Sequence, residues 1–215
     1  MTKILCVASD LLSEETTGRE VVKLASRQGQ WLERDEIETD NSVRQIIPYI
    51  VMTSVNDKGE GTVFAFERLK GGDEDRLHNK WSVGVGGHVD ETDNHRGSPI
   101  IDCAYREIKE EIKIPEGYAI DVTPEPLAAL YRSDTIVDQV HIGIVFAAEI
   151  FERTNATVLQ ILESNEPNKI QGQMYTSTQL HQMLDNGEKD FELWSQDVIR
   201  MMKDGSESEA STVPG

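Results

Sequence analysis

Residues 84–114 read GVGGHVDETDNHRGSPIIDCAYREIKEEIKI, and this stretch decides which fold the chain adopts. An apolar strand expected over 81–85 runs directly into the pair Gly86-Gly87. Ser98-Pro99 then signals the start of a helix, because serine caps the first free N–H groups and proline lacks an N–H that the first turn leaves unpaired anyway. We therefore expect a strand, a loop and then a helix that Pro115 ends.

The expected helix carries an apolar stripe and an acidic cluster on different faces. The stripe recurs at spacings of four, three and four residues, and consists of Ile101, Tyr105, Ile108 and Ile112. Glu107, Glu110 and Glu111 stand at i, i+3 and i+4, which gathers three carboxylates on one side. The cluster is either a solvated acidic surface or a site for a divalent cation, because hard ions such as Mg²⁺ prefer oxygen ligands.

The charge balance excludes two classes of partner. The 215 residues include 21 Lys+Arg and 39 Asp+Glu, a net charge of −18. Such a chain repels duplex DNA and anionic membrane surfaces, which bind proteins through Lys and Arg. The two cysteines, Cys6 and Cys103, lie far apart and without metal-site spacing, so reduced buried thiols are expected. No apolar run reaches the roughly 18 residues that span a bilayer, and we expect a soluble cytoplasmic protein.

The remaining segments suggest one main domain with extensions at both ends. Strands are expected over 3–8, 45–54, 62–68, 141–150, 157–163 and 170–175, and helices over 19–27, 177–184 and 191–202. We assign 1–40 to an N-terminal β-α extension, 41–203 to the main domain and 204–215 to a disordered tail without apolar periodicity. The extension packs on the sheet or serves a homodimer interface, and the sequence leaves both open.

Residues 84–114, hereafter the box, resemble the signature of the Nudix (MutT-like) hydrolases, G-x5-E-x7-R-E-U-x-E-E-x-G-U with U apolar. The half from Arg106 to Ile114 matches at every fixed position but one, where Lys113 replaces glycine. The order of the neighbouring strands also suits that family. The resemblance implies an α/β fold, a Nudix-type α/β/α sandwich with a mixed curved sheet and the box helix on one face.

The loop of the box departs from the family pattern. Gly87 and Arg106 are 19 positions apart, whereas the pattern has 14, so about five residues are inserted. Counting back from Arg106 puts Ser98 where the first glutamate belongs, and counting forward from Gly87 puts Asp93 there. The sequence leaves this choice open. The expanded loop resembles the predicted MutT-family phosphoesterases, which also resemble this chain across QIIPY (45–49) and GVGGHVD (84–90).

The resemblance implies Mg²⁺- or Mn²⁺-dependent hydrolysis of a diphosphate linkage in a nucleoside diphosphate derivative or related phosphoester, by water attack on phosphorus. The partner is then a small-molecule nucleotide or diphosphate. The implied ion ligands are Glu107, Glu110, Glu111 and the carbonyl of Gly86. Glu107 would also help to deprotonate the water, and Arg106 would orient the carboxylates.

Three residues outside this set are weaker candidates. Asp93 and Glu163 could each add an oxygen ligand, or be ordinary surface carboxylates. Arg68 could meet a substrate phosphate, or form a salt bridge with Glu74 or Asp75. The inserted loop also motivates a second hypothesis, a non-catalytic module of Nudix fold that senses a nucleotide.

Overall fold

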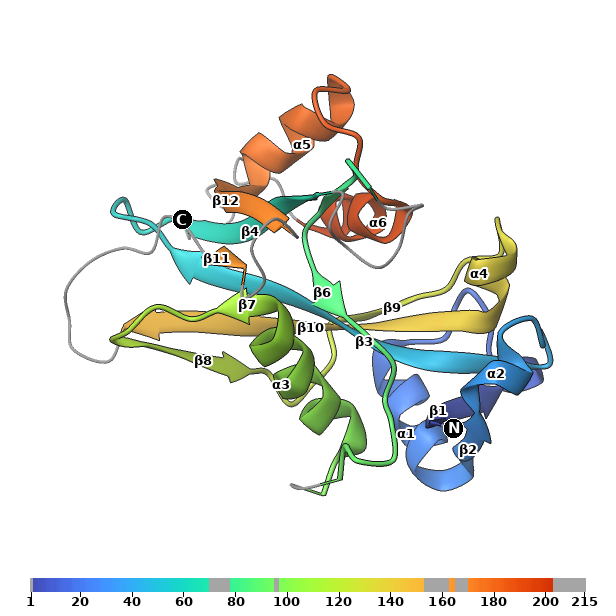
Figure 1. Cartoon of the computed structure of the whole chain (residues 1–215). Coiled ribbons are helices and arrows are strands. Elements are labelled where there is room, and N and C mark those ends of the chain that lie inside the picture. The colour runs from blue at the N-terminus through green and yellow to red at the C-terminus, as the bar shows by residue number, and fades with distance from the viewer. Residues whose placement is uncertain (1, 70–77, 95–96, 153–162, 165–169, 203–215) are drawn as a thin grey trace, which may run out of the picture. The chain divides into compact units, whose positions relative to one another are not determined.

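The computed structural model describes residues 2–69, 78–94, 97–152, 163–164 and 170–202 (Figure 1). The chain forms two compact units. Unit 1 comprises Met1–Val51, Val85–Glu111 and Ile120–Glu149, and unit 2 comprises Met52–Gly84, Ile112–Ala119 and Ile150–Gly215. Three of the five points at which the chain passes between the units fall inside the strands β3 (Val43–Val55), β8 (Tyr118–Val122) and β10 (His141–Glu152).

The N-terminal strand of unit 1 lies between two antiparallel partners. Strand β1 (Lys3–Ala8) has the predicted bounds, and it pairs with β2 (Gln30–Glu33) and with β3. Cys6 stands opposite Gln30 on one side and Gln45 on the other. The four central residues of β1 are all buried, as a continuous apolar run requires when both faces of the strand are covered. The N-terminal segment therefore contributes a strand to the sheet of unit 1, whereas the division at residue 40 stays a prediction.

Helix α1 (Gly18–Gln28) follows β1 after the short helix η1 (Ser9–Leu11). Thr17 and Glu20 form a capping box, in which the Thr17 N–H donates to Glu20 Oε2 at 2.8 Å and Thr17 Oγ1 accepts from the Glu20 N–H. A side chain at Gly18 would come within 2.5 Å of the Ala128 carbonyl oxygen in β9 (Ala128–Leu130). Glycine therefore lets the start of α1 approach the backbone of β9 closely.

The box forms the predicted loop and helix, but the strand expected over 81–85 is interrupted at Val83 and Gly84, between β5 (Trp81–Ser82) and β6 (Val85–Gly86). Strand β6 pairs antiparallel with β3, with Gly86 opposite Tyr49. Helix α3 (Pro99–Glu111) begins at the predicted proline, and the Asp102 N–H makes the first turn's bond to the Ser98 carbonyl at 2.9 Å. The helix ends before Pro115, because Ile112 and Lys113 form the strand β7, which pairs within unit 2 with β11 (Glu163–Ser164).

The predicted faces of α3 were partly wrong. The buried apolar residues are Ile100, Cys103, Ala104 and Ile108, together with Ile112 just beyond the helix. Ile101 and Tyr105 are only partly buried. The Tyr105 hydroxyl finds partners in Asp121 Oδ1 at 2.9 Å and the Val122 N–H at 3.1 Å. Cys103 and Ala104 lie on the buried face of α3, and Glu107 is buried on the same helix.

Arg44 fixes the segment that leads into β10. Its Nη1 donates to the carbonyl oxygens of Arg132, Asp138 and His141 at 2.8–2.9 Å. Its guanidinium carbon lies 3.9 Å from the centre of the Tyr131 ring. Asp138 lies in the short helix α4 (Ile136–Val140), and His141 follows this helix directly. The contacts of one buried arginine thus tie β3 to the start of β10.

Unit 2 contains the end of β3, the predicted strand over 62–68 and the predicted C-terminal helices. Strand β4 (Gly61–Arg68) pairs antiparallel with the end of β3, with Thr53 opposite Val63. It also pairs with β12 (Ile170–Thr176) and with β5 (Trp81–Ser82). The predicted helices appear as α5 (Ser177–Asp185) and α6 (Leu193–Met201). The predicted strand over 157–163 lies outside the described residues except for Glu163, and the tail 204–215 lies outside them entirely.

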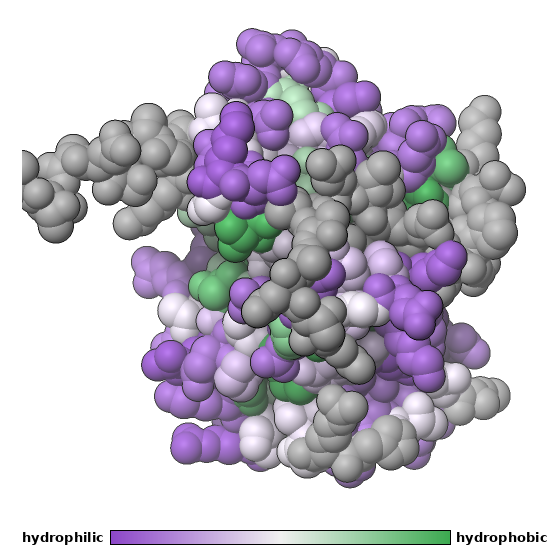
Figure 2. Space-filling model, turned by 90° about the vertical axis from the view of Figure 1, so that its left-hand side faces the viewer, coloured by the Kyte–Doolittle hydropathy of each residue, from purple (hydrophilic) through white to green (hydrophobic). Residues whose placement is uncertain are grey.

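The surface of the described residues is largely polar. Figure 2 shows one face on which hydrophilic side chains dominate and apolar ones form small separate patches. Among the helices of the described segments, none is both long and apolar enough to pass through a membrane.

Candidate active site

Two glycines place the backbone of the box loop against its neighbours. A side chain at Gly86 would come within 2.2 Å of the Pro48 carbonyl oxygen in β3. A side chain at Gly87 would come within 2.2 Å of Oε1 and 2.5 Å of Cδ of Glu107. The carboxylate of Glu107 therefore lies directly on the backbone of Gly87. These positions exclude side chains, which gives a physical reason for two consecutive glycines here.

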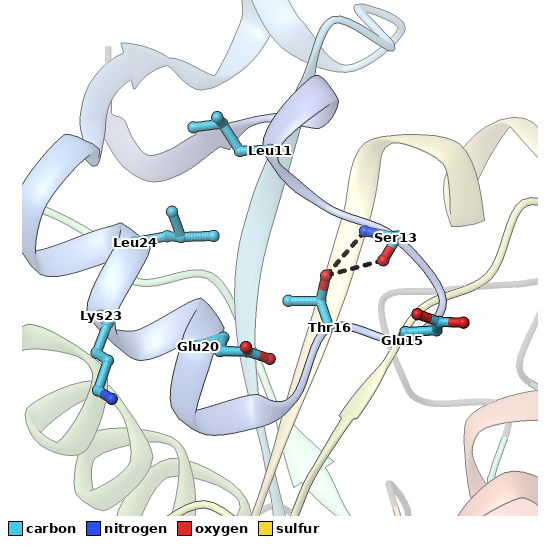
Figure 3. A pocket seen from close by; sticks show the side chains of 7 residues that line it. All are labelled: Leu11, Ser13, Glu15, Thr16, Glu20, Lys23 and Leu24. Atoms are coloured by element: carbon cyan, nitrogen blue, oxygen red, sulfur yellow. Dashed lines mark hydrogen bonds between the residues drawn. The ribbon is translucent and has the colours of Figure 1, made fainter.

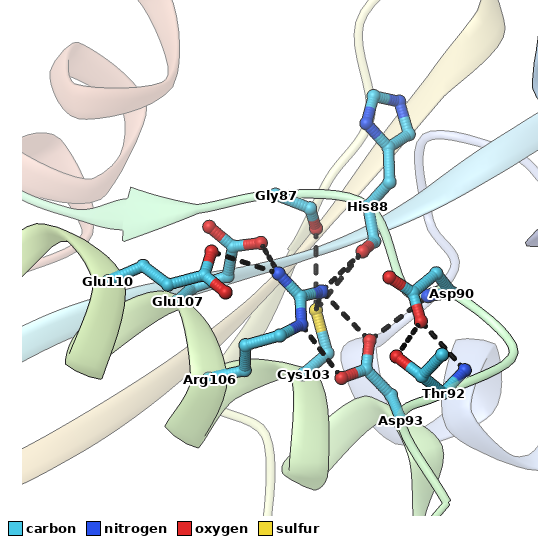
Figure 4. Close-up of polar contacts among 9 residues, drawn as sticks. All are labelled: Gly87, His88, Asp90, Thr92, Asp93, Cys103, Arg106, Glu107 and Glu110. Atoms are coloured by element: carbon cyan, nitrogen blue, oxygen red, sulfur yellow. Dashed lines mark hydrogen bonds and ion pairs between the residues drawn. The ribbon is translucent and has the colours of Figure 1, made fainter. Parts of the chain in front are cut away.

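Arg106 is the centre of the polar contacts in unit 1 (Figure 4). Its Nε and Nη2 donate to the two carboxylate oxygens of Asp93 at 2.9 and 2.8 Å. Its Nη1 donates to Glu107 Oε1 at 2.5 Å and to Glu110 Oε2 at 3.3 Å. Nη2 also donates to the His88 carbonyl oxygen at 2.9 Å. One guanidinium thus joins the box loop to two carboxylates of α3, and its hydrogen bonds to Asp93 raise the pKa of Arg106.

Asp93, rather than Ser98, lies against Arg106. The Asp93 side chain is almost completely buried, and its Oδ2 also accepts from the Asp90 N–H at 3.0 Å. The Asp90 carbonyl in turn accepts from the Asp93 N–H, which closes a tight turn. Ser98 stands just before α3 and supplies its carbonyl to the first helical turn. Of the two candidates, the structure therefore brings Asp93 into contact with Arg106, and the choice of alignment stays a prediction.

Glu107 is a buried carboxylate with one oxygen engaged. Only 9% of the residue is exposed, and this burial raises its pKa even though Arg106 acts in the opposite direction. Oε1 accepts from Arg106, whereas the contacts among the described residues give Oε2 no hydrogen-bond donor. A buried carboxylate with a raised pKa and a free oxygen has the properties of a general base or an ion ligand.

Glu110 and Glu111 extend the acidic surface of α3 away from Glu107. Glu110 is exposed and contacts Arg106 at the i, i+4 spacing, and Glu111 is partly buried. Glu110, Glu111, Asp93 and Glu107 together are four carboxylates. The single positive charge of Arg106 can neutralise only one of them. The box helix therefore carries excess negative charge, which favours a bound cation.

The residues of α3 fit a hard divalent cation by their chemistry. Their side-chain donors are carboxylate oxygens, and the Glu107 carboxylate occupies a space that any side chain at Gly87 would fill. Within the described part of the chain, no three His, Cys, Asp or Glu side chains stand in an arrangement that could hold a metal ion as they are oriented. Assigning Glu107, Glu110, Glu111 and the Gly86 carbonyl as ligands therefore remains a proposal.

Arg68 and Glu163 belong to unit 2. Arg68 Nε lies 3.8 Å from Glu192 Oε2, and its guanidinium carbon lies 5.4 Å from the centre of the Phe66 ring. Glu163 begins β11 opposite Lys113. Glu74 and Asp75, the expected salt-bridge partners of Arg68, lie outside the described residues. The roles of Arg68 in phosphate binding and of Glu163 as an ion ligand stay predictions.

A surface hollow in unit 1 involves other residues (Figure 3). It is lined by Leu11, Ser13, Glu15, Thr16, Glu20, Lys23 and Leu24. Two of its polar side chains are already used locally, because Thr16 Oγ1 accepts from the Ser13 N–H at 2.8 Å and Glu20 caps α1. None of these residues belongs to the box, so the candidate active site rests on the box itself.

Comparison with known proteins gives a relative in sequence and, among the similar solved structures, one with a likeness over most of both chains. No protein-family model matches the chain. The chain is 31% identical over 193 residues to Protein YmaB of Bacillus subtilis (strain 168), a match that covers 89% of this chain and 86% of that protein. Its structure is similar to the crystal structure of Tm1382, a candidate Nudix hydrolase, with a TM-score of 0.68, 22% identity and coverage of 92% of this chain and 96% of that one.

The likeness to Tm1382 confirms the predicted Nudix-type α/β sandwich fold. The identity to Protein YmaB extends over most of both chains, and this is sufficient to place them in one family. The chain therefore belongs to the family of Protein YmaB and has the Nudix fold.

Proposed function

We propose that the chain is a metal-dependent hydrolase that cleaves a diphosphate linkage in a nucleoside diphosphate derivative or related phosphoester by water attack on phosphorus. The observation that carries the proposal is the position of Glu107. Its carboxylate lies on Gly87, is held by Arg106 through Oε1, and keeps Oε2 without a donor among the described contacts. The Nudix fold supports the same chemistry.

Each residue of the box has a distinct task in this proposal. Glu107 accepts a proton from the attacking water, because its raised pKa makes it a stronger base than an exposed carboxylate. Arg106 fixes the direction of the Glu107 carboxylate and is itself fixed by Asp93. Asp93 is therefore a positioning residue here, since both of its oxygens accept from Arg106.

A divalent cation explains how an acidic site accepts an anionic substrate. The carboxylates of Glu107, Glu110 and Glu111 and the carbonyl of Gly86 would hold Mg²⁺ or Mn²⁺. When bound, the ion supplies positive charge and Lewis acidity at the phosphoryl oxygens. Without such an ion the excess negative charge of α3 would repel a diphosphate.

The test measures hydrolysis by the untagged full chain with Mg²⁺ or Mn²⁺. Nucleotide sugars, ADP-ribose, dinucleoside polyphosphates and dNTPs serve as substrates, and the released products are quantified. We expect turnover of at least one class, lost with EDTA and strongly reduced in Glu110→Gln. Glu116→Gln, which removes an exposed carboxylate beyond the end of α3, is the matched control and should retain activity.

Two results would contradict the hydrolase. The first is that no class of substrate turns over, and the second is that Glu110→Gln turns over as fast as the wild type. Nucleotide-dependent thermal stabilisation without any product would instead support the second hypothesis, a sensing module of Nudix fold.

A further inference from the structure

Two imidazole rings and an amide oxygen converge in unit 1 apart from the carboxylates of α3. His88 Nε2 lies 3.1 Å from His141 Nε2 and 2.7 Å from Gln45 Oε1. The ring centres are 5.2 Å apart. The three residues come from the box loop, the first residue of β10 and β3. Figure 4 shows the imidazole of His88 directed away from Glu107 and Glu110.

Hydrogen bonds to neighbouring backbone carbonyl groups orient the side chains of His141 and Gln45. His141 Nδ1 lies 2.7 Å from the Val137 carbonyl oxygen, which holds the proton on Nδ1 and leaves a lone pair on Nε2. Gln45 Nε2 donates to the Ile37 carbonyl oxygen at 3.2 Å, which turns Oε1 toward His88. Arg44 donates to the His141 carbonyl oxygen at 2.9 Å and fixes the backbone there.

The separation of the two Nε2 atoms matches shared coordination of one ion. Zinc–imidazole bonds are about 2.0–2.1 Å long. When the N–Zn–N angle lies between a right angle and the tetrahedral angle, the two nitrogens are therefore about 2.9–3.4 Å apart. The observed distance of 3.1 Å lies in this interval. Gln45 Oε1, at 2.7 Å from His88 Nε2, is an oxygen that could supply a third ligand beside the two nitrogens.

We propose that His88, His141 and Gln45 form a binding site for a borderline transition-metal ion such as Zn²⁺, Cu²⁺ or Ni²⁺. Imidazole nitrogen suits these ions, whereas Mg²⁺ prefers carboxylate oxygen and water. Both rings are partly buried, whereas Gln45 is completely buried. The site is chemically distinct from the carboxylates of α3 and does not depend on the proposed hydrolase activity.

Two positive charges act on the His88 ring, those of Arg34 and Arg106, and both repel a dication. In the metal-free protein the His88 Nε2–H donates to Gln45, and on binding this proton moves through solvent to Nδ1 of the same ring. The net charge of His88 is then unchanged.

The experiment uses Cu²⁺ as the probe, added to the untagged full chain in excess Mg²⁺ and followed by electron paramagnetic resonance. Nitrogen superhyperfine splitting counts the imidazoles on the ion. We expect two coupled nitrogens in the wild type and at most one in His141→Ala. His181→Ala is the matched control, because the Nδ1 of His181 likewise lies against the carbonyl oxygen four residues earlier, that of Ser177. This variant should keep the wild-type pattern.

Further variants separate the site from misfolding and from the α3 carboxylates. His141→Gln replaces the ring by an amide, and a wild-type melting temperature of the metal-free variant with loss of one coupled nitrogen supports the proposal. Glu110→Gln should keep both coupled nitrogens. A wild type without nitrogen coupling overturns the proposal, and so does a folded His141 variant with the wild-type spectrum.

Discussion

Arg106 donates to both carboxylate oxygens of Asp93, from Nε at 2.9 Å and from Nη2 at 2.8 Å, although 13 positions separate the two residues in the sequence. The Asp93 side chain is 4% exposed and that of Arg106 is 27% exposed. The pair therefore fastens the inserted loop to α3 through two charge-assisted hydrogen bonds in a largely dry environment. Glu107 is oriented by the same guanidinium, so the loop and the proposed base share one anchor.

Asp93→Asn should destabilise the chain and reduce hydrolysis. Breaking a buried ion pair costs about 3–5 kcal/mol, and because Arg106 is partly exposed we expect the lower end, about 3 kcal/mol. Ser98→Ala is the control for the alternative alignment and should keep both stability and activity, because Ser98 bonds to the start of α3 through its backbone carbonyl. Urea denaturation and the hydrolysis assay measure both. Equal effects of the two substitutions would show that Asp93 has no special role.

Gly87→Ala should abolish most of the activity. The new methyl group would stand 2.2 Å from Glu107 Oε1, so the carboxylate must move away from its place beside the box loop. Displacing a catalytic group by about 1 Å commonly reduces kcat by about 100-fold. Gly61→Ala is the control, because a side chain at Gly61 has no neighbour within 4 Å. A Gly87→Ala protein with wild-type kcat would show that the Glu107 position is not needed.

Local sequence patterns predicted strand β1 and the start of helix α3 well. Strand β1 was predicted from a continuous apolar run, and the start of α3 from a proline after a serine. Each of these signals acts on neighbouring residues and needs no knowledge of distant ones. The Nudix fold followed from a box whose strand, loop and helix appear in the structure in the predicted order.

Local sequence patterns could not predict the contacts between segments that lie far apart in the sequence. The choice between Asp93 and Ser98 depends on how the inserted loop folds back on α3, which residue spacing does not determine. The buried face of α3 includes Cys103, Ala104 and Glu107, which the spacing of the isoleucine stripe did not predict. The convergence of His88 and His141 joins segments 53 positions apart.

Glu107→Gln should abolish hydrolysis without lowering the melting temperature. Hydrolysis should be lost, because an amide neither accepts the proton nor binds the ion as a carboxylate does. The melting temperature should stay equal or rise, because burial disfavours the charge of Glu107 more than Arg106 favours it. Differential scanning calorimetry with EDTA measures the stability without bound metal. A large fall in melting temperature would show that the ion pair with Arg106 stabilises the fold.

Both cysteines should be unreactive in the folded protein. Cys6 and Cys103 are fully buried, and burial raises the pKa of Cys6 to about 12 and that of Cys103 still further above its usual range. The thiolate is the reactive form, so almost none is present near neutral pH. Titration with Ellman's reagent should give no native thiols and two after denaturation in guanidinium.

The Cys6→Ser variant assigns any residual reaction to one thiol. Cys103 Sγ lies 3.4 Å from the His88 carbonyl oxygen and 3.3 Å from Arg106 Nη2, so a reagent that reached it would have to displace the box loop. Reaction of Cys103 should therefore proceed only as fast as the protein opens, and it should slow when Mg²⁺ and a nucleotide stabilise the folded state. Rapid labelling of Cys103 in the native chain would mean that the contacts between this loop and α3 are open in solution, and the anchoring role assigned to Arg106 would then be wrong.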